Sequence, residues 1–101
     1  MEMQEKMELS SKISKNLSKF NEIKKIVIFG SYFRSKKPND IDIAIIQDSK
    51  SDFLFLSLKY RKELRYIAKK IEMDILPIKE SANGLFLDEI NKGIVIYEKR
   101  D

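Results

Sequence analysis

Between Ile26 and Ile46 the chain reads IVIFGSYFRSKKPNDIDIAII, which predicts two strands joined by a turn and a polar loop. The apolar run IVIF stops abruptly at Gly30, as a strand in the core of a sheet would. Gly30 permits backbone angles that a side chain forbids, and it lets a ligand approach the backbone closely. Ser31 is a favourable N-cap, so residues 32–35 are expected to begin a helical turn whose free N–H groups point at an anion.

The second predicted strand begins with two acidic residues. Side chains alternate between the two faces of a strand, so its residues are expected to divide into two sets. One set is Ile41, Ile43 and Ile45, and the other is Asp40, Asp42, Ala44 and Ile46. Asp40 and Asp42 are therefore expected to share one face, roughly 6.6 Å apart along the strand. Their carboxylates repel each other unless a positive charge lies between them.

The composition limits the chemistry that the chain can use. Its 101 residues are expected to form one domain, residues 1–101, with a single ordinary core. The absence of cysteine and histidine excludes disulfides, thiolate or histidine zinc sites, and acid–base catalysis by histidine. Carboxylates remain as the metal ligands. The net charge of +4 is compatible with a phosphate-bearing ligand, but it is too small to decide between classes of partner.

The balance of hydrophobic (43%) and charged (36%) residues fits a soluble globular protein better than a disordered chain. No apolar run approaches the ~20 residues that a membrane span requires, and the N-terminus is too charged for a signal peptide. We therefore expect a cytoplasmic protein.

The remaining segments predict helices and strands around this pair of strands. Helices are expected over residues 4–20 and 52–70, strands over 73–78 and 94–97, a turn at Asn83-Gly84, and a short helix containing Phe86, Leu87 and Ile90. The expected buried stripe of the first helix is Leu9, Ile13, Leu17 and Phe20. That of the second, capped by Ser49 or Ser51, is Phe53, Leu56, Tyr60, Leu64, Ile67 and Ile71. The order α-β-β-α-β-α-β predicts an α/β (α+β) fold, with one small sheet of about four strands and helices packed on it.

A third acidic residue, Asp74, lies in the predicted strand over 73–78. Three aspartates on two strands could hold hard divalent cations through oxygen, with Mg²⁺ as the default. Two such ions about 3.5–4 Å apart would clamp the attacking and leaving oxygens of a phosphoryl transfer. Each part alone has an ordinary explanation, because Gly-Ser is usually a turn, Asp-x-Asp is usually a solvated strand end, and Asp74 could be an edge residue. Their combination in one small domain indicates a site.

These motifs resemble those of a known family. Gly30-Ser31, Asp40-Ile41-Asp42 and Asp74 are similar to the motifs of the nucleotidyltransferase superfamily typified by DNA polymerase beta, with its minimal nucleotidyltransferase (MNT) branch as the nearest match. The resemblance covers nearly the whole chain and implies a nucleoside triphosphate bound over a short mixed sheet. It implies that Gly30 and Ser31 grip the β- and γ-phosphates. It also implies that Asp40 and Asp42 bind two Mg²⁺ ions, and that Asp74 helps to hold one ion and activates the accepting hydroxyl.

The resemblance also implies a kind of partner. Minimal members of the family are often encoded beside a HEPN-type ribonuclease toxin, and some neutralise it by transferring AMP onto its tyrosine. This implies an antitoxin that transfers AMP from ATP to a hydroxyl of a partner protein. A domain this small has little room for an acceptor-binding domain of its own. We therefore expect a separate acceptor chain or a homo-oligomer, with apolar helix surface as the contact.

The loop between the motifs departs from the family pattern. Eight residues, 32–39, separate Gly-Ser from Asp-x-Asp where ten are common. Ser35 stands where glycine is frequent, and Asn39 stands where serine usually precedes the first aspartate. These departures support a second hypothesis, in which the chain is a non-catalytic binding module that neutralises a partner by occlusion.

Basic residues near the motifs have more than one interpretation. Arg34, Lys36 and Lys37 either neutralise the triphosphate, with Arg34 as the candidate nucleotide-binding residue, or form a solvated basic loop. The second helix has a basic side made of Lys59, Lys62, Arg65 and Lys69. We expect this side to face solvent or a partner, because no aromatic residues that could stack on bases are interleaved with it. An RNA-binding domain is the third and weakest hypothesis.

Overall fold

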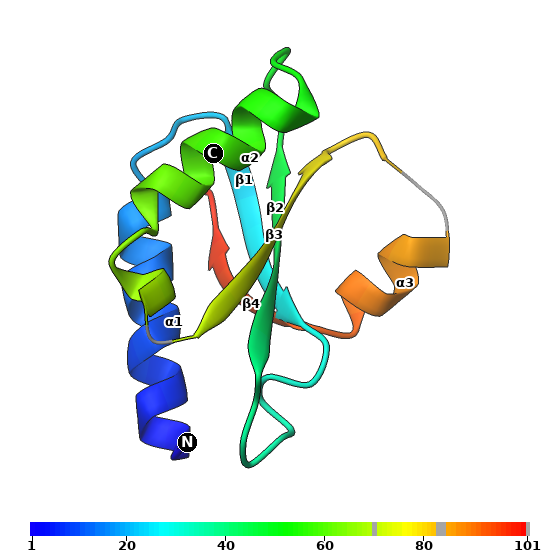
Figure 1. Cartoon of the computed structure of the whole chain (residues 1–101). Coiled ribbons are helices and arrows are strands. Elements are labelled where there is room, and N and C mark those ends of the chain that lie inside the picture. The colour runs from blue at the N-terminus through cyan, green and yellow to red at the C-terminus, as the bar shows by residue number, and fades with distance from the viewer. Residues whose placement is uncertain (70, 83–84, 101) are drawn as a thin grey trace.

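A computed structural model describes residues 1–69, 71–82 and 85–100 of the chain (Figure 1). The elements follow one another in the predicted order. They are α1 (Met3–Leu17), β1 (Ile23–Phe29), β2 (Asp40–Gln47), α2 (Phe53–Glu63), the 3₁₀ helix η1 (Ile67–Lys69), β3 (Glu72–Lys79), α3 (Leu85–Asn91) and β4 (Ile94–Glu98). No helix in these described ranges has the length and apolar character needed to cross a membrane.

The four strands form one mixed sheet in the order β3-β2-β1-β4, which confirms the predicted fold class. β1 is antiparallel to both β2 and β4, whereas β3 is parallel to β2. A parallel pair needs a crossover connection, and α2 lies in it. The register places Asp42 opposite Phe29 at the end of β1 and opposite Asp74 on β3. The strand pairing alone therefore makes the acidic residues of β2 and β3 neighbours.

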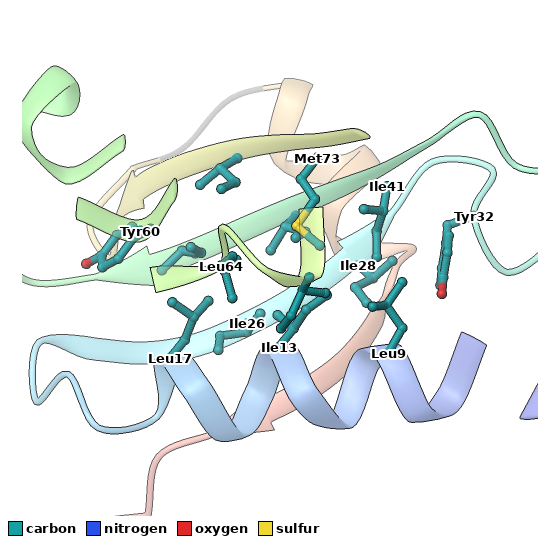
Figure 2. Close-up of a cluster of buried hydrophobic side chains, with 14 of the residues drawn as sticks. Leu9, Ile13, Leu17, Ile26, Ile28, Tyr32, Ile41, Tyr60, Leu64 and Met73 are labelled. Carbon is teal, nitrogen blue, oxygen red and sulfur yellow. The ribbon is translucent and has the colours of Figure 1, made fainter. Parts of the chain in front are cut away.

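The alternation along β2 separates the two faces of the sheet as predicted. Ile41, Ile43 and Ile45 are fully buried in the larger core, together with Leu9, Ile13 and Leu17 of α1, whose side chains point at the sheet in Figure 2. Ala44 lies on the opposite face and packs with Val27 and with Ile90 of α3. In Figure 1, α1 and α2 lie on one side of the sheet and α3 lies on the other. Asp40 and Asp42 belong to the face of α3.

The prediction of one long helix over residues 52–70 was wrong. α2 ends at Glu63, and the chain then turns at Leu64 and enters η1. The position of β3 accounts for the break, because Glu72 must pair with Asp40 at the start of β2. Seven more helical residues would instead carry the chain roughly 10 Å further along the helix axis. Leu64, Ile67 and Ile71 are nevertheless buried, as predicted.

The start of α2 also differs from the prediction. The cap is Asp52, whose carboxylate accepts a hydrogen bond from the backbone N–H of Phe55 at 2.8 Å, so neither Ser49 nor Ser51 has this role. Phe53 was expected to be buried, but its side chain is 57% exposed. It is the first residue of the helix, three positions before Leu56, where burial of this helix begins.

Smaller differences concern the ends of other elements. The first helix ends at Leu17, and Phe20 follows it as a half-buried residue whose ring centroid lies 5.7 Å from that of Tyr60. The short helix predicted near the C-terminus is α3. The turn predicted at Asn83-Gly84 lies outside the described residues.

Candidate active site

Three carboxylates meet on the face of the sheet that carries α3. Asp40 and Asp42 come from β2 and Asp74 comes from β3, and each offers an oxygen within 4.8 Å of the others. Asp40 and Asp42 are half-buried, whereas Asp74 is exposed. The structure thus brings together all three aspartates that the sequence singled out. The strand pairing of Asp42 with Asp74 is the cause.

The environment of Asp42 opposes its ionisation. Burial raises the pKa of this carboxyl, and the charges of Asp40 and Asp74 and a hydrogen bond to the side chain of Asp74 raise it further, to about 6. A divalent cation bound among the three carboxylates would remove this repulsion. All three donors are hard oxygen ligands on two rigid strands, which is the donor set that fits Mg²⁺.

Gly30 lies directly beside Asp42. Its φ of 74° is in the left-handed region that L side chains rarely adopt. A Cβ atom added at Gly30 would overlap Oδ2 of Asp42. Glycine is therefore required here for two reasons, the backbone conformation and the close approach of a carboxylate from the neighbouring strand.

The residues after Gly30 form the single helical turn that the sequence predicted. The carbonyl of Ser31 accepts hydrogen bonds from the backbone N–H groups of Arg34 (3.0 Å) and Ser35 (2.8 Å). Ser31 itself is exposed. The guanidinium of Arg34 folds back and donates from Nη2 to the carbonyl of Gly30 at 3.0 Å, while Lys36 and Lys37 remain exposed. Gly30, Ser31 and Arg34 thus form one turn, which adjoins the three aspartates where Gly30 meets Asp42.

A buried lysine that the sequence analysis missed fixes this turn to α1. The Lys6 side chain is only 4% exposed, and its ammonium donates to the backbone carbonyls of Phe33 and Ser35. The buried Tyr32 hydroxyl donates to the carbonyl of Lys6 at 3.3 Å. Lys6 stands three residues before Leu9, on the same apolar stripe, and this position in a buried stripe is the sequence signal that could have revealed it.

A second residue that the sequence analysis passed over is Arg61 of α2. It lines a cavity of about 330 Å³ together with Phe29, Asp42, Asp74, Ile75 and Leu76. Its Nη1 lies 3.5 Å from the carbonyl of Met73, at the edge strand β3. Of the basic residues predicted to lie along one side of this helix, Lys59 forms an ion pair with Glu22 at 2.9 Å. The basic side is thus smaller than predicted, whereas Arg61 lines the same cavity as Asp42 and Asp74.

Comparison with known proteins identifies the family. The family described as Polymerase beta, Nucleotidyltransferase matches residues 11–101. The chain belongs to this nucleotidyltransferase family. Membership supports transferase activity as the general class of function, and the mixed four-stranded sheet is the nucleotidyltransferase fold. No curated protein matches the sequence.

Several solved structures share this nucleotidyltransferase fold. One is the toxin–antitoxin MntA–HepT, with a TM-score of 0.62 and 19% identity over 90% of this chain and 71% of that chain. Another is a toxin–antitoxin with AMP-PNP, with a TM-score of 0.69 and 22% identity over 90% of this chain and 74% of that one. A third is a mutant of the toxin–antitoxin MntA–HepT, with a TM-score of 0.69 and 20% identity over 90% of this chain and 74% of that one.

Proposed function

We propose that this chain is an antitoxin that transfers AMP from ATP to a hydroxyl group of a partner protein, in a reaction that depends on Mg²⁺. The observation that carries the proposal is the trio Asp40, Asp42 and Asp74, which meets beside the turn at Gly30 and Ser31. The family match supports nucleotidyl transfer, and the structures of similar fold are toxin–antitoxin proteins, one of them with an ATP analogue. The acceptor that this parallel favours is a tyrosine of a HEPN-type toxin.

Each residue of the site has a part in the proposed reaction. Gly30 lets the triphosphate approach the backbone, and Ser31 donates hydrogen bonds to its β- and γ-phosphates. Arg34, whose guanidinium donates to the carbonyl of Gly30, adds positive charge near the leaving group. Asp40, Asp42 and Asp74 would hold two Mg²⁺ ions. When bound, these ions supply charge neutralisation at the phosphates and lower the pKa of the attacking hydroxyl.

The transfer itself is an in-line displacement at the α-phosphorus. The acceptor oxygen bonds to this phosphorus while the bond to the oxygen that bridges to the β-phosphate breaks, so pyrophosphate leaves. The hydroxyl proton passes to the carboxylate of Asp74. Asp74 is the exposed member of the trio, which suits a group that must meet an acceptor arriving from solvent.

The test is the transfer of label from α-³²P-labelled ATP, with Mg²⁺, to the protein encoded by the adjacent gene. We expect that protein to be labelled on tyrosine and we expect Asp42→Asn to abolish the labelling, because one of the three metal ligands is lost. Labelling by Asp42→Asn at the rate of the unmodified protein would overturn the assignment.

The alternative is an inactive member of the family that neutralises its partner by complex formation alone. It is favoured by the loop of eight residues, 32–39, and by Ser35 in place of glycine. It predicts a stable complex without nucleotide or metal, and full neutralisation by a variant with Asn at both Asp40 and Asp42. Loss of neutralisation in that double variant would exclude this alternative.

A further inference from the structure

The first half of α2 has large apolar side chains on its solvent side. Phe53, Leu54, Phe55 and Leu58 are 57%, 66%, 57% and 59% exposed. The helix start is well defined, because Asp52 caps it through the N–H of Phe55. A helix that is apolar on its inner and its outer side is normally covered on both. A contiguous exposed apolar surface of this kind marks a site of interaction.

This apolar surface is on the α2 side of the sheet, and Arg61 connects it, at the edge strand β3, with the candidate active site. Leu54, Leu58 and Arg61 are spaced by four and three residues, so they lie along one side of α2 over roughly 10 Å. Arg61 is at the inner end of this row, where it lines the cavity that contains Asp42 and Asp74. Across the sheet, the turn at Gly30 after β1 is followed by the aspartates of β2, then by Asp74 of β3, and then by Arg61 at the edge. The turn at Gly30 and Ser31, proposed above to bind the triphosphate, is at one end of this series, which leaves the end at Arg61 for an acceptor.

The charges near Arg61 indicate what kind of molecule would occupy this surface. Neither Arg61 nor Lys62 forms an ion pair with any described residue, whereas Lys59 and Glu63 on the same helix are paired with Glu22 and Lys19. The surface is therefore apolar at its outer end and has, at its inner end, two cations without a carboxylate partner among the described residues. It is complementary to a protein segment with apolar side chains followed by an acidic group. A second copy of this chain fits less well, because both acidic residues it would offer here are engaged. Asp52 accepts the capping hydrogen bond, and Glu63 is paired with Lys19.

We propose that Leu54, Leu58 and Arg61 form the docking face for the protein that receives the nucleotide, and that Arg61 binds an acidic side chain next to the accepting hydroxyl. The inference rests on the proposed function, since it names the side from which the acceptor approaches. It assigns Arg61 to recognition of the acceptor and leaves ATP binding to the turn at Gly30 and Ser31.

The experiment measures binding and transfer separately, with the protein encoded by the adjacent gene as the probe. Binding is measured by isothermal titration without nucleotide, and transfer with α-³²P-labelled ATP and Mg²⁺ gives KM for the acceptor and for ATP. Two variants of α2 are compared with the unmodified protein. One is the double variant Leu54→Ser with Leu58→Ser, and the other is Arg61→Ala. The first matched control is the double variant Met3→Ser with Met7→Ser, which alters apolar residues of α1 that are also more than half exposed. The second is Lys12→Ala, which removes an exposed charge of the same helix.

We expect both α2 variants to weaken acceptor binding and to raise its KM by more than about tenfold, with KM for ATP unchanged and both controls unaffected. Weakened binding in a protein that transfers no label would support the docking face and refute the proposed reaction. Normal transfer and binding by both α2 variants, or equal losses in the controls, would refute the docking face and leave the proposed reaction intact. No binding and no transfer by the unmodified protein would refute both the docking face and the proposed function. Gel filtration that shows a dimer, converted to a monomer by the Leu54 and Leu58 changes, would assign the face to a second copy and overturn the proposal.

Discussion

The position and the ionisation of Asp42 depend on several neighbouring residues. It pairs with Phe29 and Asp74 through the sheet, and Gly30 leaves room for its Oδ2. Burial first, and then the charges of Asp40 and Asp74, raise its pKa from 3.8 to about 6. Because the folded-state pKa is the higher one, the folded protein binds more protons than the unfolded chain between these pH values. Its stability therefore falls as pH rises through this window.

This reasoning predicts that Asp42→Asn stabilises the protein without divalent cations at pH 8. The gain is expected to be on the order of 1 kcal/mol after solvent screening, or about 5 °C in Tm. At pH 4 the two proteins should melt together, because Asp42 of the folded protein is then protonated. Thermal unfolding followed by circular dichroism at both pH values is the measurement. An equal difference at pH 4 and pH 8 would show that the effect does not come from the charge of Asp42.

Gly30 provides a second test at the scale of single residues. We expect Gly30→Ala to destabilise the fold by about 1–2 kcal/mol, because alanine is strained at positive φ and its Cβ overlaps Asp42. Asp42→Ala removes the overlapping oxygen, so urea unfolding of the double variant should show less destabilisation than the sum of the two single changes. Simple additivity would mean that the close approach to Asp42 does not matter.

At the scale of elements, the structure depends on contacts that sequence patterns describe only in part. The buried stripe of α1 was predictable because Leu9, Ile13 and Leu17 follow the helical period. The position of Lys6 on this stripe was a signal for its burial, but its contacts were not predictable, because a lysine is normally solvated and its carbonyl partners are 27 and 29 residues away in the sequence. Likewise, apolar spacing continues past Glu63 and gave no sign that α2 ends there.

The contact between α1 and the turn that follows Gly30 gives a third prediction. We expect Lys6→Met to lower the free energy of unfolding by about 1–3 kcal/mol, because the carbonyls of Phe33 and Ser35 lose a charged donor in a partly buried place. Lys12→Met, an exposed position on the same helix, is the control and should change little. Urea denaturation of the three proteins measures this. A Lys6 variant as stable as the control would contradict the assigned role.

At the scale of the whole molecule, the order of the elements and the convergence of the three aspartates were both predictable. The alternation along β2 fixed the face of Asp40 and Asp42, and the parallel pairing of β2 with β3 placed Asp74 on the same face. The approach of Arg61 was not predictable, because it depends on where α2 ends and how it lies against the edge strand β3. The exposure of Phe53 follows from where α2 begins, because Phe53 is its first residue and burial starts at Leu56. Local sequence patterns thus identified the three aspartates of the site. The position of Arg61 beside them could be found only from the tertiary structure.

The central claim is that the three aspartates and the turn at Gly30 form one site for a nucleoside triphosphate and its metal ions. Isothermal titration of ATP with Mg²⁺ into the unmodified protein and into Asp42→Asn tests it without any acceptor. We predict saturable binding by the unmodified protein that requires Mg²⁺ and is weakened at least about tenfold in Asp42→Asn, through the loss of one charged ligand. Equal binding by the two proteins, or binding by neither, would contradict the claim.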